Sequence, residues 1–397
     1  MLLSPTEPVC SCSGAGDNPA PAGQERSFLS VLPARVEQAS EPPPPPKHAA
    51  RLTVEDYVQG VRRGDRGILA RAITLIESSS GEHQARAQKV LQKLLPYSGG
   101  ARRIGITGVP GVGKSTLIEA FGCHLCDQGL KVAVLTVDPS STRSGGSILG
   151  DKTRMEQLCR RSNAFIRPSP SGRTLGGVAR KTRETILLCE AAGFNVIIVE
   201  TVGVGQSEVT VRSMVDFFLL LILPGAGDEL QGIKKGIVEQ ADAILVTKAD
   251  GENRFRAEQA KQEYGTALHY LTPPTPGWPT TVALSSALTG EGIAEFWQTV
   301  LRYYAELEPR GVIQGRRREQ SLHWLHDLIR ETIESRFYHH ERVRQARTEI
   351  ESALLRGDMT APQAARALLS LADLPGPATP TPPLGGEGAH SNPPPHV

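Results

Sequence analysis

Apolar positions between residues 99 and 305 come in short, nearly continuous runs that are rich in β-branched residues. Such runs are typical of strands buried on both faces of a sheet, because an exposed face would alternate apolar with polar side chains. Stretches with helical spacing separate most of the runs, which favours parallel strands joined by crossover helices. The pattern therefore predicts an α/β three-layer sandwich with a mainly parallel sheet. The expected strands are Ile104–Thr107, Val132–Val137, Ala164–Ile166, Val196–Val199, Phe217–Leu223, Ala243–Val246 and Thr281–Leu284.

Residues 51–98 carry apolar side chains at spacings of three and four, which is typical of amphipathic helices. The segment opens on Thr53-Val-Glu-Asp56, which has the form of a capping box. Gly64 and the cluster Ser78–Gly81 interrupt the periodicity. We therefore expect two or three helices before the first strand.

A second helical segment, at 306–372, contains a wide apolar stripe. The stripe must be buried, either on the chain's own core or against a second molecule. The run Arg316-Arg317-Arg318 ahead of it is interpreted as a solvated, charged helix start, and His339-His340 as exposed. The stripe consists of Leu322, Leu325, Ile329, Ile333 and Phe337.

The two ends of the chain, 1–50 and 373–397, are rich in proline and glycine. The first ends in the run Pro42–Pro46, which favours polyproline II. This composition cannot bury a core, so we predict disorder at both ends.

Charge and cysteine content narrow the class of protein. The net charge is +2, which gives no drive toward nucleic acid or an anionic membrane. The longest apolar run, Phe217–Leu223, is far shorter than the ~20 residues that span a bilayer. Six cysteines in 397 residues suit a reducing compartment. With neither a secretory signal nor an Arg-rich transit peptide at the N-terminus, we expect a cytoplasmic protein rather than one of the mitochondrial matrix.

The pair Cys123-His-Leu-Cys126 has no second pair to complete a zinc site. It falls inside a predicted helix, so we interpret both residues as core thiols one turn apart.

A phosphate-binding motif follows the first expected strand. The stretch Gly108 to Thr116 fits G-x-x-x-x-G-K-[ST] at every fixed position, and a helix is expected directly after it. A glycine loop between a strand and a helix N-terminus aims backbone N–H groups at an anion. Lys114 is expected to reach the β- and γ-phosphates and the Ser115 hydroxyl to ligate Mg²⁺. The predicted nucleotide contacts are Gly108, Val109, Pro110, Gly111, Val112, Gly113, Lys114, Ser115 and Thr116.

Polar loops follow the other strands, as expected where ligands bind at the carboxyl edge of a parallel sheet. Glu200 ends a strand and is followed by Gly203, the arrangement that holds Mg²⁺ through water and meets the γ-phosphate with a backbone N–H. The loop Asp138–Met155, rich in Ser, Gly and Asp after a buried strand, has the composition of a mobile metal-binding switch, and Gly225–Gly236 is another flexible, charged loop. For hydrolysis, Lys114 would stabilise charge on the γ-phosphate, and Asp138 and Gln206 are the candidates for orienting water.

Two further loops predict which base the bound nucleotide carries. The Asp250 carboxylate would accept from the N1–H and N2–H₂ edge of guanine, whereas it would repel adenine. Lys248 would lay its stem along the base, and Ser286-Ala287 would offer backbone N–H to O6. Leu288 is also predicted to contact the nucleotide. Thr247 stands where guanine-binding proteins usually have Asn. Threonine can still hydrogen-bond to the P-loop side, so we expect GTP selectivity to survive this change at some cost in affinity.

With these loops in view, the chain resembles the MeaB/MMAA (ArgK-type) family of P-loop GTPases between about residues 53 and 372. The stretches that carry the resemblance are Gly105–Thr116, Asp138–Ser141, Gly145–Met155, Glu200–Glu208 and Leu223–Gly236.

The resemblance implies a P-loop NTPase fold and a G-protein chaperone for adenosylcobalamin-dependent methylmalonyl-CoA mutase or a related acyl-CoA mutase. In this family GTP/GDP and Mg²⁺ are bound by the protein itself, and adenosylcobalamin is involved only through the partner enzyme. The resemblance also implies a homodimer formed through the 306–372 extension, and a third switch at Gly225–Gly236 with Asp228 and Lys234. The implied Mg²⁺ set is Ser115, Asp138, Asp151 and Glu200, with Gly203 at the γ-phosphate.

Three alternative functions fit part of the sequence less well. A metal-insertion GTPase of the hydrogenase or urease type would call for a His-rich tract, which the sequence does not contain. A P-loop kinase linked to basic amino-acid transport would bind ATP, against the indication of Asp250. A scaffold without activity would not need Lys114 and Ser115.

Overall fold

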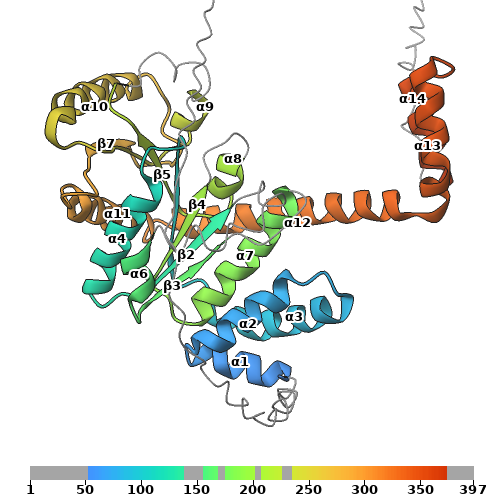
Figure 1. Ribbon diagram of the computed structural model, residues 1–397, viewed down its shortest axis with the longest axis horizontal. Coiled ribbons are helices and arrows are strands. Elements are labelled where there is room, and N and C mark those ends of the chain that lie inside the picture. Colours follow the sequence, from blue (N-terminus) through green and yellow to red (C-terminus); the bar gives the residue numbers. More distant parts are fainter. Residues whose placement is uncertain (1–51, 138–154, 169–174, 202–206, 226–234, 373–397) are drawn as a thin grey trace, which may run out of the picture. The chain divides into compact units, whose positions relative to one another are not determined.

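The computed structural model describes residues 52–137, 155–168, 175–201, 207–225 and 235–372. Its centre is one seven-stranded sheet in the order β3-β2-β4-β1-β5-β6-β7 (Figure 1). Every neighbouring pair is parallel. The predicted parallel α/β sheet is therefore confirmed. The strands are β1 Arg102–Gly108, β2 Val132–Val137, β3 Ala164–Arg167, β4 Val196–Thr201, β5 Phe217–Ile222, β6 Ala243–Val246 and β7 Thr281–Leu284.

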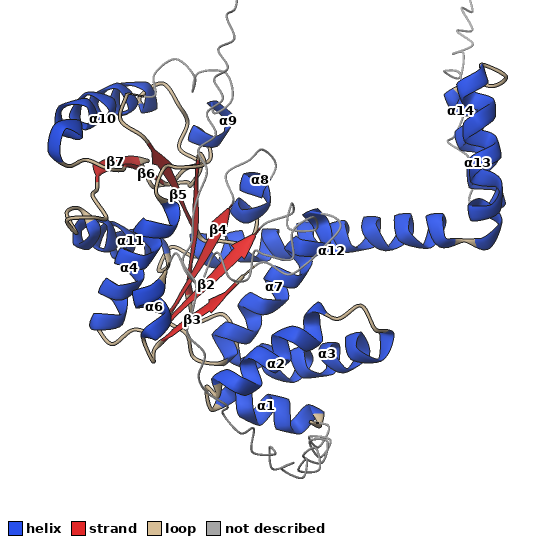
Figure 2. Cartoon of the chain, viewed as in Figure 1, coloured by secondary structure: helices blue, strands red, loops and turns tan. Residues whose placement is uncertain are grey.

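Helices cover both faces of the sheet (Figure 2). Along β5, Phe217 and Leu219 pack with α4, α6 and α11, whereas Phe218 faces the core shared with α7 and the N-terminal helices. Leu220 packs in a third cluster with α9 and α10. This alternation explains why the sequence shows continuous apolar runs. The helices are α4 Lys114–Asp127, α6 Glu156–Arg160, α7 Leu175–Ala191, α8 Ser207–Arg212, α9 Lys235–Val238, α10 Arg254–Leu268 and α11 Ile293–Leu307.

Three N-terminal helices precede the sheet, as predicted: α1 Val54–Arg62, α2 Arg66–Glu77 and α3 Gly81–Leu94. The capping box is present, since the Thr53 side chain accepts from the Asp56 N–H and the Asp56 side chain accepts from the Thr53 N–H. The apolar faces of the helices join the cluster of α7. This segment therefore shares a core with the sheet.

Two arginines anchor helix α12 (Val312–His339), and they contradict the prediction that the run at 316–318 is a solvated helix start. Arg317 donates to both oxygens of the fully buried Asp216, at 2.8 and 2.6 Å. Arg316 lies 3.8 Å from Asp242, which is also fully buried. Of the three arginines only Arg318 is exposed, so the run is not a solvated helix start. A buried carboxylate needs a charged or hydrogen-bonded partner, and α12 supplies it.

Asp216 collects donors from three elements. Besides Arg317, the Tyr304 hydroxyl donates to it at 2.7 Å and the Arg103 N–H at 3.1 Å. Burial alone would raise the pKa of Asp216, but the hydrogen bonds and charge of Arg317 hold that pKa below its ordinary value. The carboxylate is therefore charged and ties α11 and α12 to the start of β5.

The apolar stripe of α12 is largely uncovered. Leu322, Leu325, Ile329 and Ile333 are 58, 50, 47 and 56% exposed. The described residues therefore do not bury these four side chains on the chain's own core. Helices α13 (Glu341–Arg356) and α14 (Ala361–Leu371) complete the C-terminal segment.

The Cys123 and Cys126 thiols lie on α4, and Cys126 is buried. Burial raises the pKa of Cys126 to about 11. Within the described ranges no group of His, Cys, Asp and Glu side chains has the geometry of a metal site. The same ranges contain no helix with both the length and the hydropathy of a membrane span.

Candidate functional site

The phosphate-binding loop lies where β1 ends and α4 begins. Gly113, the residue before α4, has φ of 100°, a backbone conformation that side-chain-bearing residues rarely adopt. Lys114 is buried, and its Nζ donates to the carbonyls of Gly108 at 2.9 Å and Val109 at 3.1 Å. Pro110 and Gly111 are exposed on the loop, and Thr116 is exposed in the first turn of α4. The loop therefore wraps around an ammonium group at the N-terminus of a 14-residue helix, an arrangement suited to an anion.

Thr247 connects this loop to the base-side loop. Its hydroxyl donates to the carbonyl of Val112 at 2.8 Å and contacts the carbonyl of Ile222 at 3.1 Å. Val112 is fully buried. A threonine at this position thus makes the bond to the P-loop side that we expected of it.

The Ser115 hydroxyl and the Glu200 carboxylate meet at this edge of the sheet. Ser115 Oγ donates to Glu200 Oε1 at 3.3 Å. Hydroxyl and carboxylate oxygens are the donors that Mg²⁺ prefers, so these two residues fit the ion. The other predicted ligands, Asp138 and Asp151, lie outside the described residues, as do Gly203 and Gln206.

The two base-side loops are in contact. Asp250 accepts a hydrogen bond from the hydroxyl of Ser286, which is buried. Lys248 is exposed and has φ of 54°. Among the described residues other than glycine, only Lys248 has positive φ, and such strain persists where surrounding contacts impose it.

An internal hydrogen bond stabilises the loop 286–291. The Ser286 N–H donates to the carbonyl of Glu291 at 3.0 Å, and Ala287 is half-buried whereas Leu288 is 85% exposed. Arg254 at the start of α10 forms an ion pair with Glu291. The loop is therefore fixed beside α10.

Sequence reasoning missed two contributors. Thr107 and Thr201 form a buried hydroxyl pair at 2.8 Å that joins the ends of β1 and β4. The Ser286 hydroxyl, rather than its backbone alone, takes part by bonding Asp250. Position after a buried strand could have indicated Thr201, which directly follows Glu200.

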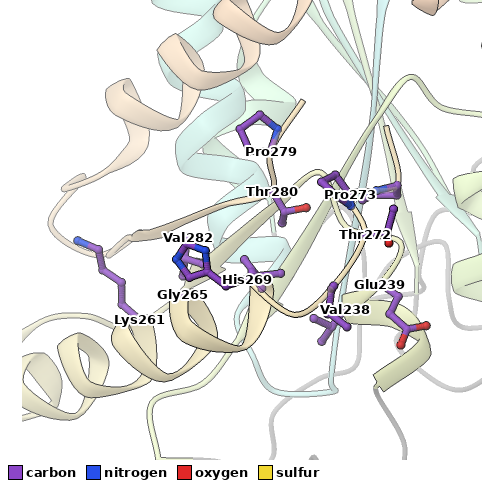
Figure 3. A pocket seen from close by; sticks show the side chains of 13 residues that line it. Val238, Glu239, Lys261, Gly265, His269, Thr272, Pro273, Pro279, Thr280 and Val282 are labelled. Carbon is purple, nitrogen blue, oxygen red and sulfur yellow. The ribbon is translucent and has the colours of Figure 1, made fainter. Parts of the chain in front are cut away.

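A pocket of about 450 Å³ lies apart from these residues, between α9, α10 and the approach to β7 (Figure 3). Gly265 and His269, near the end of α10, line it together with Pro279 and Val282. None of the residues predicted to bind nucleotide lines it. It is therefore not the nucleotide site.

Known proteins match most of the chain. The family model described as methylmalonyl-CoA mutase-associated GTPase MeaB matches residues 69–342. A Caulobacter vibrioides protein named as a GTPase is 54% identical over 319 residues, covering 80% of this chain and 98% of that protein. The Mus musculus protein named methylmalonic aciduria type A homolog, mitochondrial, is 44% identical over 326 residues, covering 80% and 79%.

One solved structure supports the same assignment. The crystal structure of a LAO/AO transport system kinase has a TM-score of 0.66 and 38% sequence identity, and the match covers 81% of this chain and 97% of that one. The chain belongs to the MeaB family of P-loop GTPases.

Proposed function

We propose that this GTPase is a G-protein chaperone for an adenosylcobalamin-dependent acyl-CoA mutase, with methylmalonyl-CoA mutase as the first candidate. The observation that carries the proposal is the match of a mutase-associated GTPase family over residues 69–342. The mouse relative's name points the same way. GTP binding and hydrolysis would gate cofactor loading and would protect or reactivate the mutase.

The arrangement of the strands supports a sensor of the nucleotide. β2, β4 and β5 lead into three predicted loops, which are Asp138–Met155, the stretch to Glu208 that follows Glu200 and includes Gly203, and Gly225–Gly236. Carboxyl ends of parallel strands share one edge of a sheet, so all three loops begin at the edge that holds Lys114. A partner that contacts such loops can distinguish GTP from GDP.

For hydrolysis we assign roles to the chain's own residues. Lys114 would leave the carbonyls of Gly108 and Val109 to bind the β- and γ-phosphates. Mg²⁺ would neutralise charge on the phosphate oxygens when bound. Ser115 and Glu200 would hold the ion, together with Asp138 and Asp151.

Neighbouring groups of the chain would contact the attacking water and the γ-phosphate. Gly203 would donate its N–H to the γ-phosphate, and Asp138 or Gln206 would orient the attacking water. These groups would act by positioning the water and the γ-phosphate, since the enzyme forms no covalent bond to the phosphoryl group.

For the base we assign Asp250 to the N1–H and N2–H₂ edge of guanine. The Ser286 hydroxyl would hold that carboxylate in place. Because the Ser286 N–H is already bonded to Glu291, O6 would be met by the N–H groups of Ala287 and Leu288. Lys248 would cover one face of the base.

The exposed stripe of α12 supports a homodimer. Four large apolar side chains about half-exposed along one helix are costly in water, and a second copy would cover them. We propose this helix as the dimer contact.

The proposal is tested by measuring GTP hydrolysis with and without methylmalonyl-CoA mutase. The mutase is expected to raise kcat at saturating GTP, because a partner that contacts the switch loops can complete the site. The Lys114→Ala variant should show no hydrolysis with or without the mutase. An unchanged kcat at saturating mutase, for several cobalamin-dependent mutases, would contradict the chaperone role.

A further inference from the structure

Strands β1 and β4 form the crevice at which the candidate nucleotide site is built. They are neighbours in the sheet, but the helices that follow them pack on opposite faces, α4 in the core cluster of Ile198 and α8 in that of Val199 (Figure 1). Neighbouring parallel strands whose connections leave to opposite sides open a crevice at their carboxyl ends, where ligands bind. The P-loop begins at the end of β1, and Glu200 lies at the end of β4. The separation of these two strand ends therefore sets the distance between the P-loop and the Glu200 carboxylate.

The backbone pairing of β1 with β4 stops before either strand ends. Among the described residues, the last pair in register is Ile106 with Glu200. Beyond that pair, β1 continues along β5 and β4 continues along β2. Here the two strands are linked by a hydrogen bond between the hydroxyls of Thr107 and Thr201, whose oxygens are 2.8 Å apart. The hydroxyl pair therefore bridges the opening of the crevice.

The hydroxyl pair is buried behind the predicted metal site. Thr107 is 1% exposed and Thr201 is 0% exposed. Because side chains alternate along a strand, both threonines point to the face covered by α8, as Gly105 does. Glu200 points to the other face, where its carboxylate meets the Ser115 hydroxyl of α4. No water reaches the threonine pair, so a hydrogen bond lost there is not replaced by solvent.

We propose that Thr107 and Thr201 are positioning residues for Mg²⁺. Their hydroxyl pair fixes the separation of β1 and β4 at the point where the ion would be held between Ser115 and Glu200. Neither threonine would touch the ion, because both lie on the other face of the sheet. They act through the backbone, since Thr201 directly follows Glu200 and Thr107 directly precedes Gly108, the first residue of the P-loop.

The ion makes this separation matter. Octahedral coordination of Mg²⁺ at about 2.0–2.1 Å tolerates little displacement of a ligand, so a changed separation should lower the affinity for the ion. The proposal rests on the proposed assignment of Mg²⁺ to Ser115 and Glu200, and it is independent of any mutase.

The test is the Mg²⁺ dependence of nucleotide binding, which requires no hydrolysis. The Kd of the full chain for a non-hydrolysable GTP analogue is measured by isothermal titration in EDTA and over a series of free Mg²⁺ concentrations. We call the Mg²⁺ concentration at half of the gain in affinity the Mg²⁺ midpoint. Binding of Mg²⁺ to free nucleotide is the same in every sample, so differences between variants report the protein.

The Thr201→Val variant keeps the shape of the side chain and removes the hydroxyl. Its Mg²⁺ midpoint should rise about tenfold, the usual effect of removing the support of a metal ligand. Its Kd in EDTA should stay within about twofold of wild type, since the P-loop groups that bind phosphate are unchanged.

Two controls separate positioning from stability. Thr182→Val removes a similarly buried hydroxyl, which donates to the Val178 carbonyl within α7 at 2.9 Å, and it should leave the Mg²⁺ midpoint unchanged. Thr201→Ser keeps the hydroxyl and loses a buried methyl group, so it should keep the wild-type midpoint although its stability falls.

The double variant Thr107→Val/Thr201→Val has no unpaired hydroxyl, so it should be more stable than Thr201→Val alone. Two methyl groups meet at about 3.5–4.0 Å, which is wider than the hydroxyl pair, so its Mg²⁺ midpoint should stay raised. If Thr201→Val does not fold, the double variant decides: a raised midpoint supports the proposal, and a wild-type midpoint refutes it.

Four results overturn the proposal: a midpoint within about twofold of wild type in a folded Thr201→Val variant, an equal rise in Thr182→Val, an equal rise in Thr201→Ser, or a parallel loss of affinity in EDTA. The Glu200→Gln variant tests the Mg²⁺ assignment itself. It should raise the midpoint more than Thr201→Val does, because it changes a predicted ligand of the ion. An unchanged midpoint in Glu200→Gln would overturn that assignment, and the role of the threonine pair with it.

Discussion

Removing the charge of Asp216 should weaken the whole attachment of α12. The Asp216→Asn change keeps the size of a side chain that is fully buried. It removes the partner of Arg317, whose side chain is 19% exposed, and it places an amide N–H₂ among donors. Breaking a buried ion pair from one side costs about 3–5 kcal/mol, because the remaining charge stays buried without compensation. We expect the free energy of unfolding to fall by that amount.

The pH dependence gives an independent check on Asp216. Its pKa in the folded chain is lowered from 3.8, so its stabilisation is fully present above the unfolded pKa. That stabilisation is lost as the pH falls through the folded pKa. The difference between wild type and Asp216→Asn should therefore be full at neutral pH and shrink in strong acid.

Urea unfolding followed by tryptophan fluorescence measures both effects. The control is Asp358→Asn, which breaks an ion pair to Arg356 in which both side chains are about 60% exposed. Surface pairs contribute about 0–1 kcal/mol, so this change should be nearly neutral. A loss at Asp216 no larger than that at Asp358, or one that does not shrink in acid, would refute the reasoning.

Three further predictions concern the nucleotide and the dimer. Lys114→Ala should abolish GTP binding in isothermal titration, since the buried ammonium is lost from the loop; unchanged affinity would contradict the site. Asp250→Asn should weaken GTP at least tenfold and improve binding of xanthosine triphosphate, whose 2-position is an acceptor; retained GTP preference would exclude Asp250 from the base pocket. Ile329→Asp, at a position 47% exposed, should convert a dimer to a monomer in light scattering, because a charge in an apolar contact is costly; an unchanged mass would place the dimer contact elsewhere.

Much of the fold was predictable because the sheet is buried on both faces. Continuous apolar runs such as Val132–Val137 coincide with their strands. β1 begins two residues before the predicted start, at Arg102, whose backbone pairs with Val196 although its side chain is polar. Main-chain pairing at the end of a strand does not require an apolar side chain, so the apolar pattern predicts a shorter strand than the structure contains.

The charged anchor of α12 was not predictable. Arg316 and Arg317 resemble any exposed helix start, since a sequence does not show which acids will be buried. The partners Asp216 and Asp242 lie about 100 and 74 positions away in the chain and meet the arginines only through the packing of α12 on the sheet. Long-range pairs of this kind have no local signature.

The candidate site was predictable in part. Motif spacing and position after a strand pointed to Lys114, Ser115, Glu200 and Asp250, and the described structure gives the contacts of all four. The structure also shows a hydrogen bond from the Ser286 hydroxyl to Asp250. The sequence could not predict this bond, because the direction of a hydroxyl depends on the tertiary fold. The predicted roles of Asp138, Asp151, Gly203 and Gln206 stay predictions.

The most direct test of the sensor role is the affinity of the chain for methylmalonyl-CoA mutase in two nucleotide states. Isothermal titration with a non-hydrolysable GTP analogue and with GDP would give the two Kd values at one salt concentration. A sensor requires different affinities, and we predict a difference of at least about tenfold, or 1.4 kcal/mol of coupling. Lys114→Ala, which cannot hold the nucleotide, should give one Kd under both conditions. Equal Kd values for the wild-type chain, or no binding in either state, would contradict the proposed function.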